Sequence, residues 1–158
     1  TGLPVLPGSS VKGIIRSSFK PTEYIKEKLG ENYTDEKIKL LEQWIFEGKT
    51  GENPIAVYNR IIFFDALIFP GKEGFLAEDF LTPHSRIFSE PVPIKFLRIL
   101  PGSGVTFGFK IPEQTKPAPN FSINASRVRD LFKEIILDIG VGAMTGYGYG
   151  HLTFADNT

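Results

Sequence analysis

Apolar residues recur at helical spacing in three stretches of the chain. The longest stripe lies within residues 128–139 and stops at Gly140, so it predicts an amphipathic helix that ends at this glycine. A second stripe predicts a helix over residues 35–47. Its start is marked by Thr34, a plausible N-cap. Two acidic residues follow, and their negative charges interact favourably with the positive end of the helix dipole.

The third stripe predicts a short amphipathic helix over residues 9–19, directly after a Pro-Gly turn. Ser9 or Ser10 is placed to cap its N-terminus with a side-chain oxygen. Lys12 and Arg16 are four residues apart, which puts both cations on the polar face of the helix.

Continuous or alternating apolar residues predict the strands. Residues 60–69 are almost uninterrupted apolar sequence, which favours a central strand covered on both faces. Residues 92–100 and 105–111 flank a Pro-Gly-Ser-Gly turn and predict a β-hairpin, whose second strand has one buried and one open face. Residues 149–154 can form a final strand.

Three further stretches show no sustained period. Residues 48–57 are turn-rich and polar, which is typical of an exposed, mobile loop. Residues 71–91 are interpreted as an ordered excursion from the sheet, and residues 112–120, which contain three prolines, as a loop.

The predicted order is helix, helix, strand, hairpin, helix, strand, without an internal repeat of about 20–50 residues. This order indicates an α+β fold. If one strand preceded residue 1, the arrangement would be a ferredoxin-like (RRM-like) βαββαβ domain with insertions. Because the chain begins at Thr1 within an apparent turn, we expect residues 1–158 to be a single domain whose N-terminal strand is missing from this fragment.

Composition narrows the class of protein. The 158 residues, 41% of them hydrophobic, are enough for one domain with a real core. The chain has no cysteine, so disulfides, thiol nucleophiles and cysteine zinc sites are excluded. No leader and no apolar run of about 18 residues is present in the sequence. We therefore expect a soluble, cytoplasmic protein without a membrane partner.

Net charge is zero, which argues against a uniformly basic surface for nucleic acid. The distribution is uneven, however, because residues 1–20 contain Lys12, Arg16 and Lys20 but no acidic residue. A local basic face therefore remains possible.

The first predicted helix carries one candidate anion site. Its Ser-Ser-x-Lys-Gly-x-x-Arg pattern places hydroxyls, N–H groups and two cations at a helix N-terminus, which is how proteins hold a phosphate. An N-cap followed by a solvated basic face explains the same residues equally well.

The glycine-rich residues 140–150 form a second candidate site. A dinucleotide site is not expected, because this segment follows a helix and precedes a strand, the reverse of the required order. It is either a tight structural connection or a loop whose exposed backbone touches a ligand. Tyr147 and Tyr149 could stack on bases or pack against the sheet.

Other candidate chemical groups are isolated. His84 and His151 are the only histidines and lie on unrelated elements, so neither a metal nor another cofactor is expected. His84 could touch RNA or serve as an ordinary hydrogen-bonding loop residue. Asp65, within an apolar stretch, is expected to accept hydrogen bonds from backbone donors rather than to act in catalysis.

Both ends of the sequence resemble the RAMP superfamily (repeat-associated mysterious proteins) of CRISPR effector complexes. The resemblance is carried by the Pro-Gly-Ser-Ser-x-Lys-Gly-x-x-Arg pattern at residues 7–16 and by the glycine-rich residues 140–148. Within the superfamily, residues 81–84, 91–97 and 107–109 are most similar to a subunit of the type III-B (Cmr) complex.

This resemblance implies a ferredoxin-like, non-catalytic backbone subunit that contacts guide RNA near its 3′ end, target RNA and neighbouring RAMP subunits in antiviral defence. It also implies which residues bind RNA: Ser9, Ser10, Lys12, Arg16, Gly142, Ala143, Met144, Thr145, Gly146, Tyr147 and Gly148, with His84 as a further candidate.

Two alternatives to this function stay open. Related subunits cut target RNA with an aspartate between the first strand and the first helix, and residues 1–20 contain none, so cleavage is not expected. An RNA-processing endonuclease with His84 as its general base is the first alternative. A module that only contacts neighbouring proteins is the second.

Overall fold

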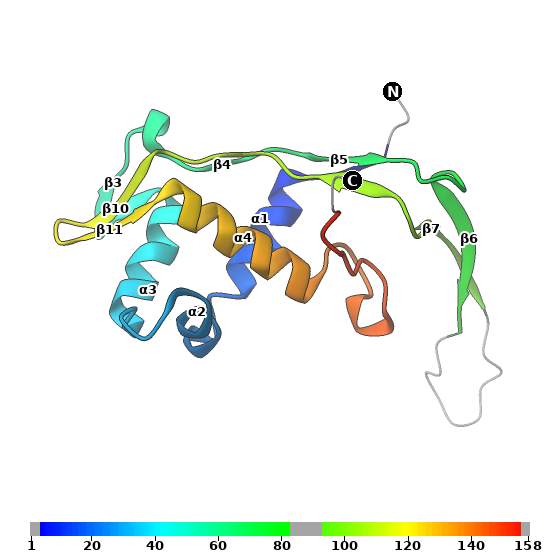
Figure 1. Cartoon of the computed structure of the whole chain (residues 1–158), viewed down its shortest axis with the longest axis horizontal. Helices are drawn as coiled ribbons and strands as arrows, with labels where there is room; N and C mark the ends of the chain where they lie inside the picture. Colours follow the sequence, from blue (N-terminus) through cyan, green and yellow to red (C-terminus); the bar gives the residue numbers. More distant parts are fainter. Residues whose placement is uncertain (1–3, 83–92, 156–158) are drawn as a thin grey trace. The chain divides into compact units, whose positions relative to one another are not determined.

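The computed structural model describes residues 4–82 and 93–155. The chain divides into two compact units, one made of residues 1–4 and 67–106 and the other of residues 5–66 and 107–158. Helices and strands are mixed along the chain, in agreement with the predicted α+β class (Figure 1). The larger unit holds all four α-helices, and the smaller unit is built from strands.

The predicted helices are present in the larger unit. They are α1 (Gly8–Ser17), α3 (Asp35–Glu42), which continues into the π-helical turn η1 (Gln43–Glu47), and α4 (Ala125–Ile139). Thr34 caps α3 as predicted, because its side-chain oxygen accepts a hydrogen bond from the N–H of Lys37. One helix was not predicted, α2 (Thr22–Leu29), which starts directly after Pro21.

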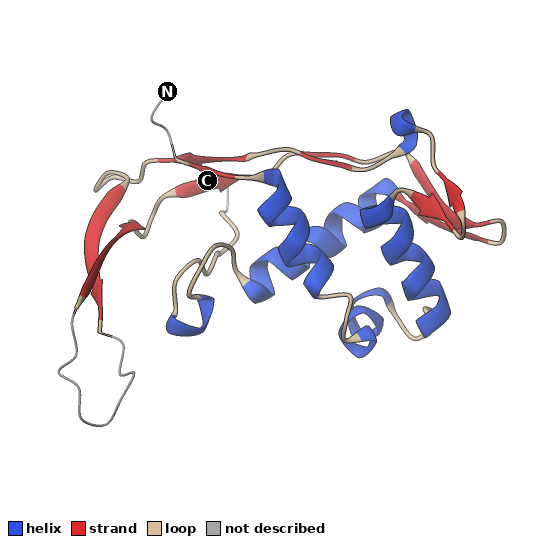
Figure 2. Cartoon of the chain, turned by 180° about the vertical axis from the view of Figure 1, so that it is seen from behind, coloured by secondary structure: helices blue, strands red, loops and turns tan. Residues whose placement is uncertain are grey.

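Helix α4 lies at the centre of the core of the larger unit. Its apolar stripe is buried from Val128 to Ile136, and the ring of Phe132 lies 5.4 Å from that of Phe63 and 5.2 Å from that of Phe109. The apolar side of α1 is buried as well, through Val11 and Ile15. Figure 2 shows the helices gathered on one side of the strands that carry Phe63 and Phe109.

These two phenylalanines lie on a short antiparallel ladder formed by β4 (Ile62–Phe63) and β9 (Phe109–Lys110). The continuous central strand predicted over residues 60–69 is wrong. The segment is interrupted at Phe64-Asp65, and β5 (Ala66–Phe69) begins after it. Its apolar residues alternate between buried and exposed, so it is not covered on both faces.

Two other loop predictions for this unit are wrong. Residues 48–57 contain a tight antiparallel hairpin of β2 (Lys49–Thr50) and β3 (Asn53–Pro54). Residues 112–120 contain β10 (Gln114–Ala118), which pairs with β11 (Phe121–Asn124) across a two-residue turn. Both errors arise because proline and polar residues occur in short edge strands as well as in loops.

The predicted final strand over residues 149–154 is also wrong. Residues 151–155 follow an irregular path after the 3-10 turn η3 (Thr145–Tyr147). Phe154 instead lies against α4, where the Lys133 ammonium sits 3.5 Å from the centre of its ring. A cation over an aromatic face is a favourable contact that needs no strand partner.

Polar contacts join α2 to the C-terminal end of α4. Asp138 accepts a hydrogen bond from the Tyr24 hydroxyl at 2.9 Å and pairs with the Lys28 ammonium at 2.7 Å. The hydrogen bond from Lys28, together with that from Tyr24, lowers the pKa of Asp138, whereas burial and the bond to Asp138 raise the pKa of Tyr24. Arg127 adds a contact to the backbone carbonyl of Lys28.

In the smaller unit, β5 pairs with β8 (Gly104–Thr106), and β6 (Leu76–Leu81) pairs with β7 (Ile94–Ile99). The hairpin predicted between residues 92–100 and 105–111 is therefore wrong, since its two halves pair with earlier strands. The Pro-Gly-Ser-Gly turn connects two different ladders. Residues 76–81, which lie in the stretch interpreted as an ordered excursion from the sheet, form a regular strand.

The β6–β7 hairpin has one strongly apolar face. Register pairs Leu76 with Ile99, Glu78 with Leu97 and Phe80 with Lys95, so these six side chains share a face, and all six are exposed. We call this the apolar hairpin face. Glu78 and Lys95 neutralise each other through an ion pair of 2.6 Å, which leaves the face without net charge.

No helix in the described part of the chain is long and apolar enough to cross a membrane.

Candidate nucleic-acid interface

The N-terminus of α1 is capped by an aspartate that is distant in the sequence. Pro7 is the N-cap residue, and the backbone N–H of Gly8 donates a hydrogen bond of 2.7 Å to Oδ1 of Asp65. The predicted capping by Ser9 or Ser10 is therefore wrong. Both serines lie within the first turn with exposed side chains, whereas Asp65 accepts a backbone hydrogen bond as expected.

At Gly8, α1 lies very close to the backbone of β4. A β-carbon at this position would lie 2.3 Å from the carbonyl oxygen of Phe63 and 2.9 Å from the carbonyl carbon of Phe64. Only glycine fits so close to another backbone segment. The short approach places the first turn of α1 directly beside the C-terminal end of β4.

Arg16 is held by carboxylates of the α3–η1 segment. Its Nε lies 3.3 Å from Oε1 of Glu42 and its Nη2 lies 2.7 Å from Oε1 of Glu47, while the guanidinium sits 6.0 Å from the centre of the Phe46 ring. Its contact with RNA stays a prediction, and any phosphate would compete with two carboxylates.

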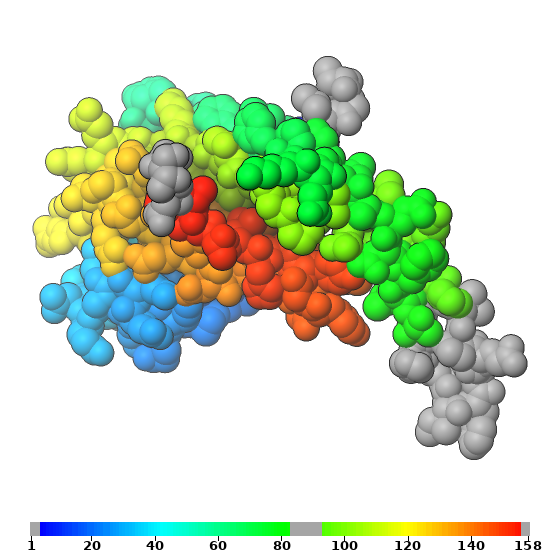
Figure 3. All heavy atoms as spheres, turned by 45° about the vertical axis from the view of Figure 1, so that its right-hand side comes forward, coloured from blue at the N-terminus to red at the C-terminus, as the bar shows by residue number. Residues whose placement is uncertain are grey.

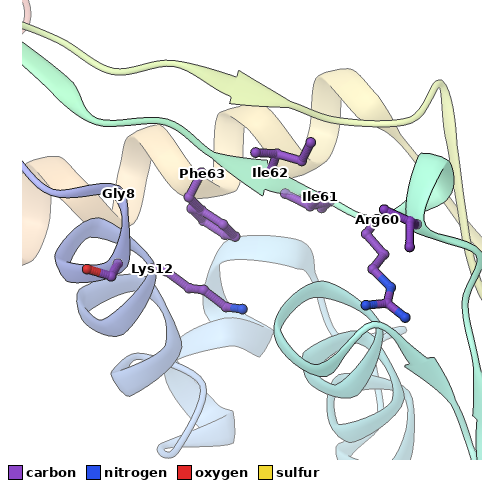
Figure 4. A pocket seen from close by; sticks show the side chains of 8 residues that line it. Gly8, Lys12, Arg60, Ile61, Ile62 and Phe63 are labelled. Atoms are coloured by element: carbon purple, nitrogen blue, oxygen red, sulfur yellow. The ribbon is translucent and has the colours of Figure 1, made fainter.

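Lys12, one turn earlier on α1, has a different environment. It lines a pocket of about 290 Å³ together with Gly8, Ser9, Arg60 and apolar residues of the 57–63 segment. In Figure 4, Lys12 and Arg60 extend from opposite sides toward the same space. No acidic residue lines this pocket, and neither cation pairs with a carboxylate among the residues that the structure describes.

Arg60 was not predicted as a site residue. Arg60 is the first residue of the strand predicted over residues 60–69. Nothing in the local sequence distinguishes it from any other arginine that begins a strand. Its Nε donates a hydrogen bond of 2.9 Å to the carbonyl of Ile55, and its side chain passes over Gly48. The residues that flank the β2–β3 hairpin therefore fix the direction of the Arg60 side chain. Because the sequence analysis did not predict this hairpin, it could not predict where Arg60 points.

The glycine-rich residues 140–150 form a closed loop with a narrow neck. Val141 donates its N–H to the carbonyl of Gly150 at 2.9 Å, and a β-carbon on Gly150 would lie 1.8 Å from the carbonyl oxygen of Val141. A β-carbon on Gly140 would in turn lie 2.7 Å from the carbonyl oxygen of Gly150. Gly140 and Gly150 are thus needed for the tight structural connection, which was one of the two interpretations of this segment.

The tip of this loop lies at the surface (orange in Figure 3). It contains the turn η3, flanked by Met144 and Gly148, both in the left-handed conformation. Tyr147 is 74% exposed, and a ring nitrogen of His151 lies 3.1 Å from the carbonyl oxygen of Thr145. The remaining predicted loop residues, Gly142, Ala143 and Gly146, are exposed.

The sequence matches the model of a known family over almost the whole chain, including both end motifs. The model of the RAMP superfamily matches residues 1–153. The chain belongs to the RAMP superfamily. Its α1 and its glycine-rich loop are the two motifs from which the resemblance was inferred, and both lie in the larger unit.

Solved structures extend this comparison. The RAMP chain is 28% identical to a chain in the cryo-EM structure of the type III-B Cmr-beta bound to cognate target RNA, with a TM-score of 0.60 over 94% of its length. It spans 44% of that chain. It is also similar to Cmr6 from Pyrococcus furiosus, at 20% identity and a TM-score of 0.48, covering 95% of this chain and 82% of that one. No curated protein matches the sequence.

His84 lies outside the described residues, so its predicted contact with RNA stays a prediction. Within the described residues, no group of three or more histidine or acidic side chains is arranged to hold a metal ion.

Proposed function

We propose that this RAMP chain is a non-catalytic, RNA-binding subunit of a type III-B CRISPR effector complex. The observation that carries the proposal is its similarity, across 94% of its length, to a chain of a type III-B Cmr complex bound to target RNA. The pocket beside α1 supports it, because Lys12 and Arg60 are cations without carboxylate partners among the described residues. Such cations are available to RNA phosphates.

The finer assignment follows the sequence motifs. We infer a ferredoxin-like RAMP domain comparable to the sixth subunit of the Cmr complex, which contacts guide RNA near its 3′ end in antiviral defence. The phosphate backbone would contact the first turn of α1 and the exposed tip of the glycine-rich loop. Sequence specificity would come from pairing between guide and target strands rather than from contacts to base edges.

The first test measures the salt dependence of RNA binding. We expect the purified chain to retain single-stranded RNA with an affinity that falls as salt rises, because binding releases counterions from the phosphates. Lys12→Gln should reduce the slope of log affinity against log salt by about 0.7, the value for one phosphate contact on a single strand. Fluorescence anisotropy with labelled RNA at four salt concentrations gives both slopes.

Lys39→Gln on α3 is the matched control, since Lys39 is exposed and belongs to neither motif. It should leave the slope of the unaltered chain in place. Equal slopes for the Lys12 variant and the unaltered chain would remove Lys12 from the RNA contact. The same samples run on a denaturing gel should show intact RNA. Cleavage that His84→Ala abolishes would support the endonuclease instead.

The apolar hairpin face supports a second role for the same subunit, which is contact with a neighbouring RAMP subunit. Leu76, Phe80 and Leu97 are 48%, 60% and 65% exposed, which is unusual for large apolar side chains that share one strand face. The central Glu78–Lys95 pair removes net charge from the face. An uncharged apolar surface of this kind is typical of the buried centre of a protein interface.

We expect Leu97→Lys to prevent assembly with the other subunits of the complex while the chain still binds RNA. The lysine would place an unpaired charge in an apolar interface, which is costly. Lys72→Gln, at an exposed position before β6, is the control. Size-exclusion chromatography of the reconstituted complex provides the measurement. Normal assembly of the Leu97 variant would exclude this face from the interface.

A further inference from the structure

The pocket beside α1 combines charge with apolar surface. Lys12 and the Ser9 hydroxyl come from α1, Arg60 precedes β4, and Val57, Ile61 and Ile62 supply the apolar wall. The only charged residues that line the pocket are the two cations, which makes it attractive to an anion.

The cations of this pocket differ from four others in the larger unit, which lie in ion pairs. Arg16, Lys26 and Lys28 each pair with at least one carboxylate. Arg60 instead uses its Nε for the carbonyl of Ile55, and no hydrogen bond within the described residues occupies the outer nitrogens of its guanidinium. The Ile55 bond and the close contact with Gly48 hold the guanidinium in place before any ligand arrives. A preorganised cation loses less entropy when it binds a phosphate.

The apolar wall shows that a phosphate alone is not the best match. Val57 is 71% exposed and Ile62 is 39% exposed, both beside the cations. A nucleotide offers a phosphate together with the flat apolar face of a base, and such bases gain energy by lying against apolar side chains. A volume of about 290 Å³ lies at the lower end of small-ligand pockets, so it suits one nucleotide and not a longer segment.

We propose that this pocket holds one nucleotide of the bound single-stranded RNA, with its phosphate between Lys12 and Arg60 and its base against Val57 and Ile62. The proposal rests on the RNA binding proposed above and adds to it a specific position on the protein. The first N–H of α1 takes no part, because Asp65 already occupies it. The contact is independent of base identity, since no polar side chain of the pocket is placed on the apolar wall to read a base edge.

Two pairs of variants test the pocket. Val57 and Tyr58 are neighbours in the turn η2 (Val57–Asn59) and are 71% and 72% exposed, but only Val57 lines the pocket. Val57→Glu should therefore weaken RNA binding about tenfold, and Tyr58→Glu should weaken it less than threefold. Arg60→Gln should also cost about tenfold, the size of one charge-assisted hydrogen bond to a phosphate. Arg129→Gln, an exposed position on α4, should change little.

A spectroscopic readout reports on the base itself. Single-stranded RNAs that carry 2-aminopurine at successive positions should show, at one position, a fluorescence change on binding. This change should disappear in Val57→Glu and persist in Tyr58→Glu. Thermal unfolding of all four variants identifies any that fail to fold, and because Val57 is exposed, its replacement does not disturb the core.

The outcomes separate the two proposals. If the unaltered chain binds RNA and the Val57 and Arg60 variants bind it like their controls, the pocket proposal is overturned and RNA binding stands. If the unaltered chain does not bind RNA at all, the proposed function fails first. Binding of AMP without binding of RNA would mean a free nucleotide ligand and would overturn both.

Discussion

Gly8→Ala should lower the free energy of unfolding by about 1–3 kcal/mol, the usual cost of inserting a methyl group into a filled space. The new β-carbon would lie 2.3 Å from the carbonyl oxygen of Phe63 and 2.9 Å from the carbonyl carbon of Phe64. These atoms are backbone, so they cannot turn aside as a side chain would. The first turn of α1 must move away from β4, and the hydrogen bond from Gly8 to Asp65 is lost with it.

The same displacement should also weaken RNA binding, because Gly8 and Lys12 line the pocket that Arg60 completes. Urea unfolding and fluorescence anisotropy measure the two effects. Gly13→Ala is a control within the same helix, since nothing lies within 4 Å of its β-carbon. That substitution should raise stability by about 0.5–1 kcal/mol, because alanine loses less backbone entropy than glycine in a helix. Equal effects at the two glycines would contradict the close approach at Gly8.

Phe132→Ala should be the most destabilising of the substitutions considered, at about 3–5 kcal/mol. Its ring is fully buried and touches Phe63 on β4 and Phe109 on β9, at centroid distances of 5.4 and 5.2 Å. Removing the Phe132 ring leaves a cavity between α4 and the strands β4 and β9. The loss is a large part of the roughly 5–15 kcal/mol that stabilises a typical domain.

Chemical denaturation followed by tryptophan fluorescence suits this measurement, because the single tryptophan, Trp44, is buried in the same unit. Phe154→Ala is the control. Phe154 is 63% exposed and lies under Lys133, so its loss should cost about 0.5–1 kcal/mol, the value of an exposed cation–π contact. A small loss at Phe132 would mean that α4 does not anchor the core.

The sequence predicted three of the four α-helices and both family motifs, because these features are local. Helical periodicity within residues 128–139 is contained in one segment, and the Thr34 cap forms a hydrogen bond only three residues away. The two RAMP motifs are likewise continuous stretches at the ends of the chain. The helix that escaped prediction, α2, is short, and its hydrogen bond from Tyr24 reaches α4, more than a hundred residues later.

The strand pairings were predicted wrongly, because the residues of a strand do not indicate which other strand it pairs with. The stretch around Pro101 reads as a hairpin turn, yet β7 pairs backward with β6 and β8 pairs backward with β5. Prolines and polar residues in 48–57 and 112–120 suggested loops, although short edge strands accept them. When two possible strand pairings fit the local sequence equally well, long-range packing decides which of them forms.

The amino-acid sequence by itself determined the family, three of the four α-helices, and α1 and the glycine-rich loop as the segments proposed to contact RNA. The tertiary structure decided which residues of those segments are available to RNA. Arg16 lies beside Glu42 and Glu47, 26 and 31 positions away, and the helix end is capped by Asp65, 57 positions from Gly8. Lys12 lines a pocket with Arg60 and with no carboxylate. The charges act through space, so their partners follow from the fold and not from spacing along the chain.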